Sequence, residues 1–280
     1  MKREILILFL IVIILSACSG SVSEMNSTIR IKGSDTMLYL TKILAREYMK
    51  TNPGISVYVE GGGTVTGIKA LAEGEIDICT ASRPLEGEDI KLFAEKFRSI
   101  GVSTLIAKDA LCIYVNLKNP VNNLEVEQLK HIFICNINDW VELGWDNEKI
   151  ILVGRNTNSG TYLYFKEHVL DGNDYCDQMN VEPTTESLVR FVSANQYAIG
   201  YGGIGYVTDS VKTLKINGLS SSKENVLNDK YPISRYLHFY TIQPPQGKIK
   251  DFIDWVISDE GQKFISQSGY ISIWSKNLNK

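Results

Sequence analysis

The sequence predicts an α/β fold of two lobes, each a mostly parallel sheet flanked by helices. Three observations support this: apolar residues alternate between strand and helical spacing, loops of small residues separate these segments, and 280 residues suffice for two domains of about 100–150 residues. Two chain crossings, near 105–115 and 205–210, are expected to form a hinge. The expected boundaries are 28–112 and 208–280 for lobe 1 and 113–207 for lobe 2.

The first part of the chain has the order strand, helix, strand, helix, strand. Ile29 and Ile31 alternate as in a half-buried strand, and helical spacing follows until Pro53 stops it. This order needs crossover connections, so it implies parallel strands with helices on the sheet faces. The expected elements are strands over 28–32, 55–60 and 75–80, and helices around 40–48 and 68–72.

The remaining segments continue the alternation and suggest a second α/β unit inserted into the first. A long apolar strand leads into this region, and a polar loop leaves it. The expected strands are 110–116, 150–154, a Gly-rich segment at 196–207, and 236–242. The expected helices are 126–134, 162–170 and 248–267, and the polar loop is 220–229.

The N-terminus has the features of a targeting segment. Two basic residues precede an apolar run over 5–15, which is shorter than the roughly 20 residues of a membrane span. Leu15-Ser16-Ala17-Cys18 resembles the bacterial lipobox. The sequence therefore predicts a signal peptide over 1–18, lipid attachment at Cys18 and a tether over 19–27. Ordinary cleavage near Ala17 is the alternative, although Leu15 is a poor residue at its −3 position.

Composition excludes several classes of protein. Hydrophobic residues make up 44% and charged residues 22%, which is ordinary for a globular chain and unlike disordered or collagen-like sequences. Lys and Arg number 29 and Asp and Glu number 32, so the net charge is −3. This balance argues against a nucleic-acid-binding protein, which carries a basic excess.

The cysteines and histidines do not form a metal-ligand pattern. No Cys-x-x-Cys pair is present, and no histidine stands at zinc-ligand spacing, so no metal site and no cofactor are expected. Cys79 and Cys112 lie in apolar runs and are expected to be buried, whereas a disulfide between any two of the later cysteines stays open. These cysteines are Cys79, Cys112, Cys135 and Cys176. The histidines, which are expected to be solvated or hydrogen-bonded, are His131, His168 and His238.

Three loops share one design, in which small hydroxyl and glycine residues lie between a strand and a helix. Each loop places backbone N–H groups and hydroxyls at a helix N-terminus, whose partial positive charge favours an anion. The loops are 33–36, 61–67 and 155–161, and Arg155 adds a charge-assisted donor. Neither a dinucleotide fingerprint nor a Walker P-loop is present. Ordinary N-caps and tight turns are the alternative for any single loop.

The ordered set of motifs resembles one family over nearly all of the chain after the N-terminal segment. The motifs are Gly33-Ser34-Asp35-Thr36, Glu60-Gly61-Gly62-Gly63-Thr64, Ile76-Asp77-Ile78-Cys79-Thr80-Ala81-Ser82-Arg83, Arg155-Asn156-Thr157-Asn158-Ser159-Gly160-Thr161 and Ala198-Ile199-Gly200-Tyr201. The chain resembles the phosphate-binding lipoproteins of ABC-type phosphate importers, which have the type II periplasmic-binding-protein fold.

The resemblance implies a set of phosphate ligands divided between the lobes. Hydroxyls, backbone N–H groups and one guanidinium would together surround a tetrahedral oxyanion. On lobe 1 they are Ser34, Thr36, the N–H of Met37, Thr64 and Ser82. On lobe 2 they are Arg155, Ser159, Gly160 and Thr161. No residue is expected to be catalytic.

One position differs from part of the family, and this difference leaves open which oxyanion the site binds. Some members have an aspartate after the serine that Ser82 matches, and this carboxylate accepts the proton of hydrogen phosphate; here the residue is Arg83. A carboxylate acceptor rejects fully ionised sulfate. The acceptor could instead be Asp35, Glu60 or a backbone carbonyl. Alternatively, Asp35 and Arg83 form a structural ion pair with each other.

The resemblance thus implies a receptor that closes on phosphate between its lobes and delivers it to an ABC permease. It implies a monomer on the extracytoplasmic face of the membrane, held to the bilayer by its acyl group, or in the periplasm. A receptor for another oxyanion such as sulfate is the first alternative. A secreted phosphatase with Ser34 or Ser159 as nucleophile is the second, although no G-x-S-x-G elbow is present and no histidine lies near either serine in sequence.

Overall fold

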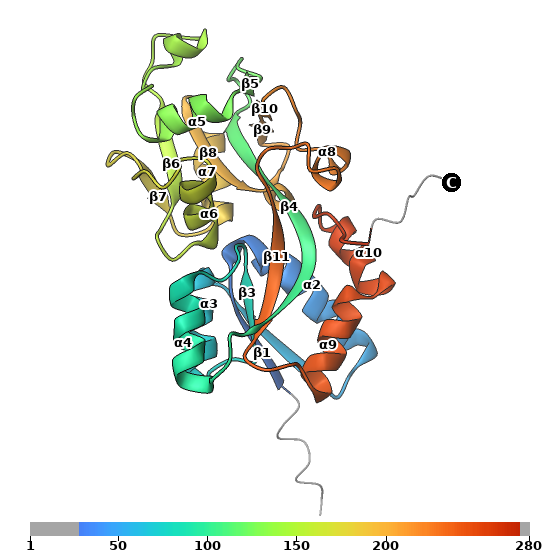
Figure 1. The fold of residues 1–280 in the computed structure, drawn as a ribbon. Helices are drawn as coiled ribbons and strands as arrows, with labels where there is room; N and C mark the ends of the chain where they lie inside the picture. The colour runs from blue at the N-terminus through green and yellow to red at the C-terminus, as the bar shows by residue number, and fades with distance from the viewer. Residues whose placement is uncertain (1–27, 275–280) are drawn as a thin grey trace, which may run out of the picture.

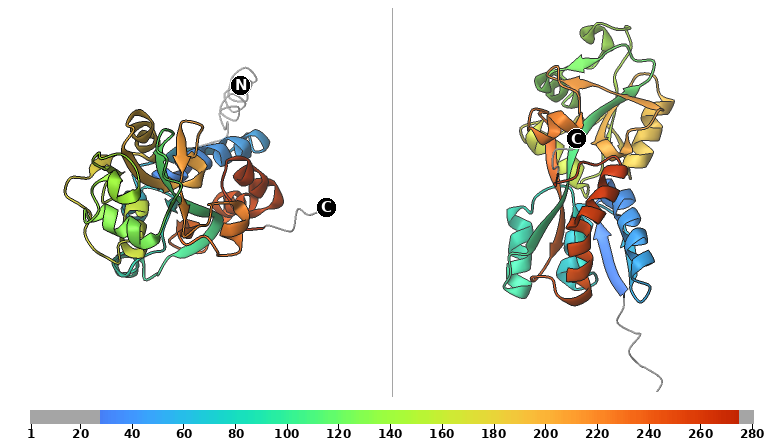
Figure 2. Two further views of the ribbon diagram at one scale, coloured as in Figure 1. Left: turned by 90° about the horizontal axis from the view of Figure 1, so that it is seen from above. Right: turned by 90° about the vertical axis from the view of Figure 1, so that its right-hand side faces the viewer.

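The computed structural model describes residues 28–274. The predicted signal peptide, its lipid-attachment residue Cys18 and the predicted tether lie outside the described residues. Two lobes lie one above the other, joined by two long strands (Figure 1; Figure 2 gives two further views). Within the described range, no helix has both the length and the apolar character needed to cross a membrane.

Lobe 1 is built on three parallel strands in the order β2-β1-β3. Ile29 and Ile31 on the central strand are fully buried, as their alternation predicts. The strands are β1 (Thr28–Gly33), β2 (Ser56–Glu60) and β3 (Ile78–Ala81), connected by α2 (Asp35–Thr51) and α3 (Thr64–Glu73). The predicted order of strands and helices is confirmed here, with the third strand shorter than expected.

Helices cover both faces of this sheet. Apolar residues of α2, α9 (Gly247–Ile257) and α10 (Asp259–Gln267) share one core cluster, and those of α3 and α4 (Gly87–Phe97) share another. The segment 248–267, predicted as one helical stretch, is two helices. Ser258 separates them, because its hydroxyl accepts from the Gly261 N–H and caps α10.

Lobe 2 has a second parallel set, in which β6 (Ile151–Arg155) lies between β8 (Ala198–Gly203) and β7 (Asn180–Glu182). Its helices are α5 (Val126–Phe133), α6 (Gly160–His168) and α7 (Thr185–Ala194). Its smaller elements are β5 (Asn123–Leu124), η2 (Trp140–Leu143), η3 (Ile204–Tyr206), β9 (Val211–Thr213), β10 (Lys215–Ile216) and α8 (Lys223–Leu227). Most predicted elements are present, whereas α7 and several short elements were not predicted.

Two antiparallel strands, β4 (Val102–Asn116) and β11 (Ser234–Thr241), cross between the lobes. They join both parallel sets into one sheet of order β2-β1-β3-β11-β4-β8-β6-β7. Residues 211–233 contribute Val211, Leu214 and Tyr231 to the core of lobe 2. The return crossing therefore lies in β11, and not near 205–210 as the sequence suggested. The segment 220–229 was predicted to be a polar loop, but its Val226 is fully buried and helps to hold this part of the chain in lobe 2.

The cysteines divide into one disulfide and two buried thiols. Cys135, just after α5, is bonded to Cys176, which lies 41 residues later. Closing a loop of this length stabilises a fold by about 3–4 kcal/mol in the chain-entropy description. Cys79 and Cys112 are free and buried, as their apolar surroundings predicted. Burial raises the pKa of the Cys112 thiol to about 12, so it stays a neutral apolar side chain.

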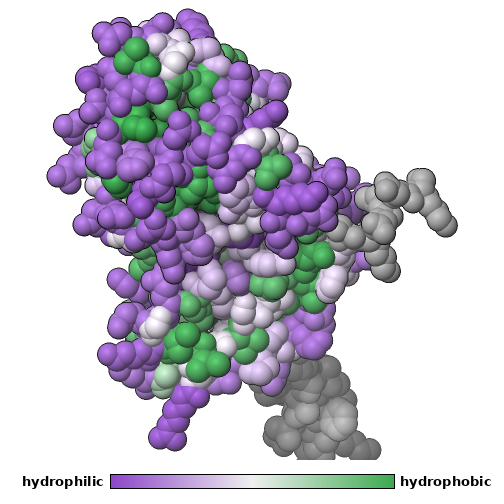
Figure 3. Space-filling view, turned by 45° about the horizontal axis from the view of Figure 1, so that its top comes forward, coloured by the Kyte–Doolittle hydropathy of each residue, from purple (hydrophilic) through white to green (hydrophobic). Residues whose placement is uncertain are grey.

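The surface is mixed in character. On the face shown in Figure 3, hydrophilic residues dominate the upper lobe, and hydrophobic residues form smaller patches on both lobes. Such scattered apolar surface is normal for a globular protein.

His238 on β11 makes the fold sensitive to acid. Its side chain is 7% exposed, and its Nδ1 lies 3.0 Å from Ser103 Oγ on β4. Burial, together with the charge of Arg235, lowers the pKa of His238 from 6.5 to about 4. Between these pH values the unfolded chain binds a proton that the folded chain does not. Stability therefore falls as pH decreases through this window.

We expect the His238 proton to cost about 3 kcal/mol of unfolding free energy between pH 7 and pH 4. Urea denaturation at several pH values measures it. His238→Asn should remove this part of the pH dependence, whereas His131→Gln, at a side chain that is 41% exposed, should keep it. Equal slopes for wild type and His238→Asn would show that His238 does not contribute.

Candidate functional site

Three helix N-termini meet where the lobes touch. They belong to α2, which follows Ser34, to α3, which starts at Thr64, and to α6, which starts at Gly160. Thr36 Oγ1 of α2 lies 2.7 Å from Thr161 Oγ1 of α6. A Cβ atom on Gly160 would lie 2.4 Å from Thr64 Oγ1. The three loops that share one sequence design therefore surround a single place, where their dipoles favour an anion.

Backbone contacts also join the lobes beside this place. The Val65 N–H of α3 donates to the Asn158 carbonyl of lobe 2 at 3.2 Å. Gly63 has φ of 94°, and a Cβ there would lie 2.4 Å from the same carbonyl oxygen. Only glycine meets both conditions. The glycine run thus allows the two lobes to approach closely. This is a more specific role than the ordinary tight turn that the sequence left as the alternative.

Ser82 presents an unused hydroxyl to the same place. The residue is fully buried, and its Oγ has no hydrogen-bond partner among the described residues. A Cβ on Gly160 would lie 2.8 Å from this oxygen, so Ser82 faces the start of α6. A buried hydroxyl without a partner costs about 1–3 kcal/mol. A ligand oxygen at the junction would offset that cost.

Three further predicted contacts differ in the hydrogen bonds that they already make. The Met37 N–H donates to the Ser34 carbonyl at 3.0 Å, so contact with an anion would require this proton to be shared. Ser159 Oγ accepts from the Tyr162 N–H at 3.4 Å as the cap of α6. Ser34 is 2% exposed, and its side chain makes no capping hydrogen bond in α2. All three residues lie at the loop junction.

Arg155 holds the junction together through protein contacts. Its Nη2 donates to Asp35 Oδ2 on lobe 1 at 2.7 Å, and the two side chains are 1% and 7% exposed. Its other bonds go to the Glu182 carbonyl, the Pro183 carbonyl and Thr185 Oγ1. Of the five N–H donors of a guanidinium, one is left over. A bidentate contact with an anion would require Arg155 to release one of these acceptors.

The two carboxylates that the sequence named as possible acceptors of the phosphate proton, Asp35 and Glu60, already have protein partners. Asp35 Oδ1 accepts from the Gly62 N–H at 2.9 Å, while its Oδ2 pairs with Arg155. The suggested pair of Asp35 with Arg83 is wrong, because Arg83 Nη1 binds Asp89 Oδ2 of α4 at 2.7 Å. The side chain of Glu60 is 42% exposed and pairs with Lys32, so it is not a buried acceptor.

Two charged residues at this place were missed by the sequence interpretation. Arg235 on β11 and Asp109 on β4 are register partners, both almost fully buried. Arg235 Nε and Nη2 donate to Asp109 Oδ2 at 3.0 and 2.9 Å, and Nη2 also donates to Thr161 Oγ1 at 3.1 Å. Burial raises the pKa of Asp109, which the charge of Arg235 partly opposes. The signals in the sequence are a single arginine in the strand SRYLHFYT and the adjacent Lys108-Asp109 pair inside a long apolar strand.

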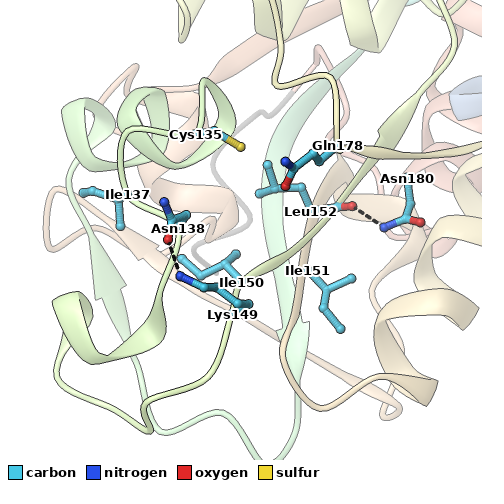
Figure 4. Close-up of a pocket in the computed structure, with 9 residues that line it drawn as sticks. All are labelled: Cys135, Ile137, Asn138, Lys149, Ile150, Ile151, Leu152, Gln178 and Asn180. Atoms are coloured by element: carbon cyan, nitrogen blue, oxygen red, sulfur yellow. Dashed lines mark hydrogen bonds between the residues drawn. The ribbon is translucent and has the colours of Figure 1, made fainter.

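Two cavities of the described chain lie away from this junction. Within residues 28–274, no group of three potential metal ligands is present. A cavity of about 560 Å³ on lobe 2 lies beside Cys135 and is lined by aliphatic, amide and lysine side chains (Figure 4). A second cavity of about 580 Å³ is lined by residues of α2, α7 and the η3 region. Neither contains a residue predicted to bind the anion.

Comparisons with known proteins agree with this geometry. A family described as the PBP superfamily domain matches residues 20–260. The phosphate-binding protein PstS of Pseudomonas aeruginosa is 33% identical over 287 residues, which cover 95% of this chain and 87% of that protein. PstS of Bacillus subtilis is 30% identical over 303 residues, which cover 100% of this chain and 98% of that protein.

Solved structures show the same relationship. A Clostridium perfringens protein, described as a phosphate ABC transporter substrate-binding protein with bound phosphate, superposes with a TM-score of 0.82 at 30% identity. The match covers 88% of this chain and 99% of that one. An ABC-type phosphate transport receptor from Vibrio cholerae has a TM-score of 0.72 at 29% identity, covering 87% and 99%. The chain therefore belongs to the PBP superfamily, within the family of phosphate-binding substrate receptors of ABC transporters.

Proposed function

We propose that this protein captures inorganic phosphate between its two lobes and delivers it to an ABC permease, without catalysis. The observation that carries the proposal is the meeting of three helix N-termini around the buried hydroxyl of Ser82, which has no hydrogen-bond partner within residues 28–274. Dipoles and hydroxyls at this junction match the oxygens of a compact oxyanion. The relatives named phosphate-binding protein support phosphate as that anion.

The proposed ligands divide between the lobes as the family resemblance implies. Because each lobe supplies contacts, the ligand binds the closed arrangement better than the open one and shifts the population toward closure. Lobe 1 supplies Ser34, Thr36, Met37, Thr64 and Ser82, and lobe 2 supplies Ser159, Gly160 and Thr161. Arg155 acts mainly by holding Asp35 and the α7 start in place, and its one remaining N–H is proposed to contact the ligand.

The proposal extends to the membrane. An acyl group on Cys18 would hold a monomeric protein at the extracytoplasmic face, close to its permease, and raise the effective concentration there. Cys18→Ser is then expected to move the protein from the membrane fraction to the soluble fraction. Continued membrane retention of that variant would contradict acylation at Cys18.

Calorimetric titration tests the function. After removal of co-purified anion, the protein should bind phosphate tightly and one-to-one, and arsenate with related affinity because its shape is similar. Sulfate should bind much more weakly if an acceptor for the phosphate proton is present. Tight sulfate binding without phosphate binding would assign the site to another oxyanion. Steady product release from a phosphate ester would indicate a phosphatase.

A further inference from the structure

We propose that Arg235, on the strand β11 that crosses back between the lobes, donates a charge-assisted hydrogen bond to the anion. This inference rests on the proposed function, because it assigns a ligand contact within the same site. It gives the site a second cationic donor beside Arg155 of the loop 155–161, and this second donor lies on a strand that crosses between the lobes.

The first argument is an unused donor. Arg235 is 3% exposed, and its Nη1 is buried without a hydrogen-bond partner among the described residues. Guanidinium N–H groups are among the most costly to bury unpaired, because their charge strengthens the preference for water or an acceptor. The structure therefore holds a cationic donor that is ready for an additional acceptor.

The second argument is direction. Arg235 Nε and Nη2 bind Asp109 along one edge of the planar guanidinium, while the other hydrogen of Nη2 goes to Thr161 Oγ1. In the rigid guanidinium plane, Nη1 shares its outer edge with Nη2 and donates parallel to it. Nη1 is thus directed to the side where Thr161 meets Thr36, which lie 2.7 Å apart through their hydroxyls.

The third argument is the contrast with Arg155. Arg155 is equally buried, but its donors go to Asp35, Thr185 and two backbone carbonyls. One of its five N–H groups is left, whereas both N–H groups of Arg235 Nη1 have no acceptor in the described part of the chain. Arg155 therefore mainly ties the lobes together and keeps one donor for the ligand, whereas Arg235 keeps two.

Asp109 acts as the positioning residue for this contact. Its Oδ2 accepts both Nε and Nη2 of Arg235, and its Oδ1 accepts from the Ile204 N–H at 3.0 Å. Both residues of the pair lie on the crossing strands, opposite each other in register. Asp109 therefore fixes the plane of the Arg235 guanidinium through both Nε and Nη2.

The test is calorimetric titration of Arg235→Lys with phosphate. Lysine keeps the charge and can still pair with Asp109, but it lacks the planar edge that carries Nη1. Affinity should fall about 10- to 100-fold, the range of a hydrogen bond to a charged group, while the melting temperature stays within a few degrees of wild type. A folded Arg235→Lys with affinity within twofold of wild type would overturn the proposal.

Two further variants separate binding from hinge packing. Lys108→Met removes another buried cation from the hinge, one that pairs with Asp229 and the Val226 carbonyl, and should leave phosphate affinity within twofold. If Arg235→Lys does not fold, the double variant Asp109→Asn/Arg235→Gln is titrated in its place. It replaces the buried ion pair with two neutral amide side chains. Wild-type affinity in that double variant would equally overturn the proposal.

Titration with several anions shows whether the Arg235 inference or the proposed function has failed. Wild type and Arg235→Lys are titrated in parallel with phosphate, arsenate and sulfate. If wild type binds another oxyanion and not phosphate, the proposed function fails, but a loss of that anion's affinity in Arg235→Lys still supports the contact. If wild type binds phosphate and the variant binds equally well, only the Arg235 inference fails.

Discussion

Gly160→Ala is expected to lower phosphate affinity about 10- to 100-fold while leaving the ligand-free lobes folded. The added Cβ would lie 2.4 Å from Thr64 Oγ1 and 2.8 Å from Ser82 Oγ, both on the opposite lobe. Overpacking of this kind costs about 1–3 kcal/mol, which equals about 5- to 150-fold in affinity. The cost falls on the closed arrangement alone, because the clash exists only when the lobes touch. Calorimetry measures the affinity and thermal melting measures the stability.

Gly87→Ala is the matched control for this prediction. Gly87 is the first residue of α4, as Gly160 is of α6, but a Cβ on Gly87 meets no atom within 4 Å. Both changes alter helix propensity in the same direction. Gly87→Ala should keep wild-type affinity. Equal affinities for the two variants would mean that the lobes do not close on Gly160 when the ligand binds.

Asp35→Asn should weaken phosphate binding by about 100-fold. The Asp35–Arg155 pair is buried and joins the two lobes at 2.7 Å. Removing one partner of a buried pair costs about 3–5 kcal/mol, because the other charge stays buried without compensation. In the open arrangement water can solvate Arg155, so most of this cost opposes closure. The asparagine keeps an oxygen for the Gly62 N–H, which limits damage to the first loop.

Asp89→Asn provides the comparison within one lobe. Asp89 Oδ2 pairs with Arg83 Nη1 at 2.7 Å, the same length as the Asp35 Oδ2–Arg155 Nη2 contact, but both residues belong to lobe 1. Loss of the Asp89–Arg83 pair should lower the melting temperature and leave phosphate affinity within twofold of wild type. Asp35→Asn should instead lower phosphate affinity with little change in melting temperature. If both variants lose only thermal stability, the Asp35–Arg155 pair has no role in closure.

Much of the fold was predictable because its signals are local. Alternation at Ile29 and Ile31, the proline after the first helix and the three loop designs each depend on residues a few positions apart. The two helices within 248–267 and the unpredicted α4 show the limit of that approach. Ser258 caps a helix in the middle of an uninterrupted apolar pattern, and a capping box starts α4 in a mostly polar segment.

By itself, the sequence determined the strand and helix order and the three loops with anion-binding chemistry. Its motifs also indicated the family. Tertiary structure alone decided which charges pair: Asp35 with Arg155, Arg83 with Asp89, and Asp109 with Arg235. Two of these pairs join residues 120 and 126 positions apart that meet only in the fold, and Asp109 and Arg235 are opposite each other in the register of β4 and β11. A charged group inside a protein must find its counter-charge in space, and no spacing along the sequence records that distance.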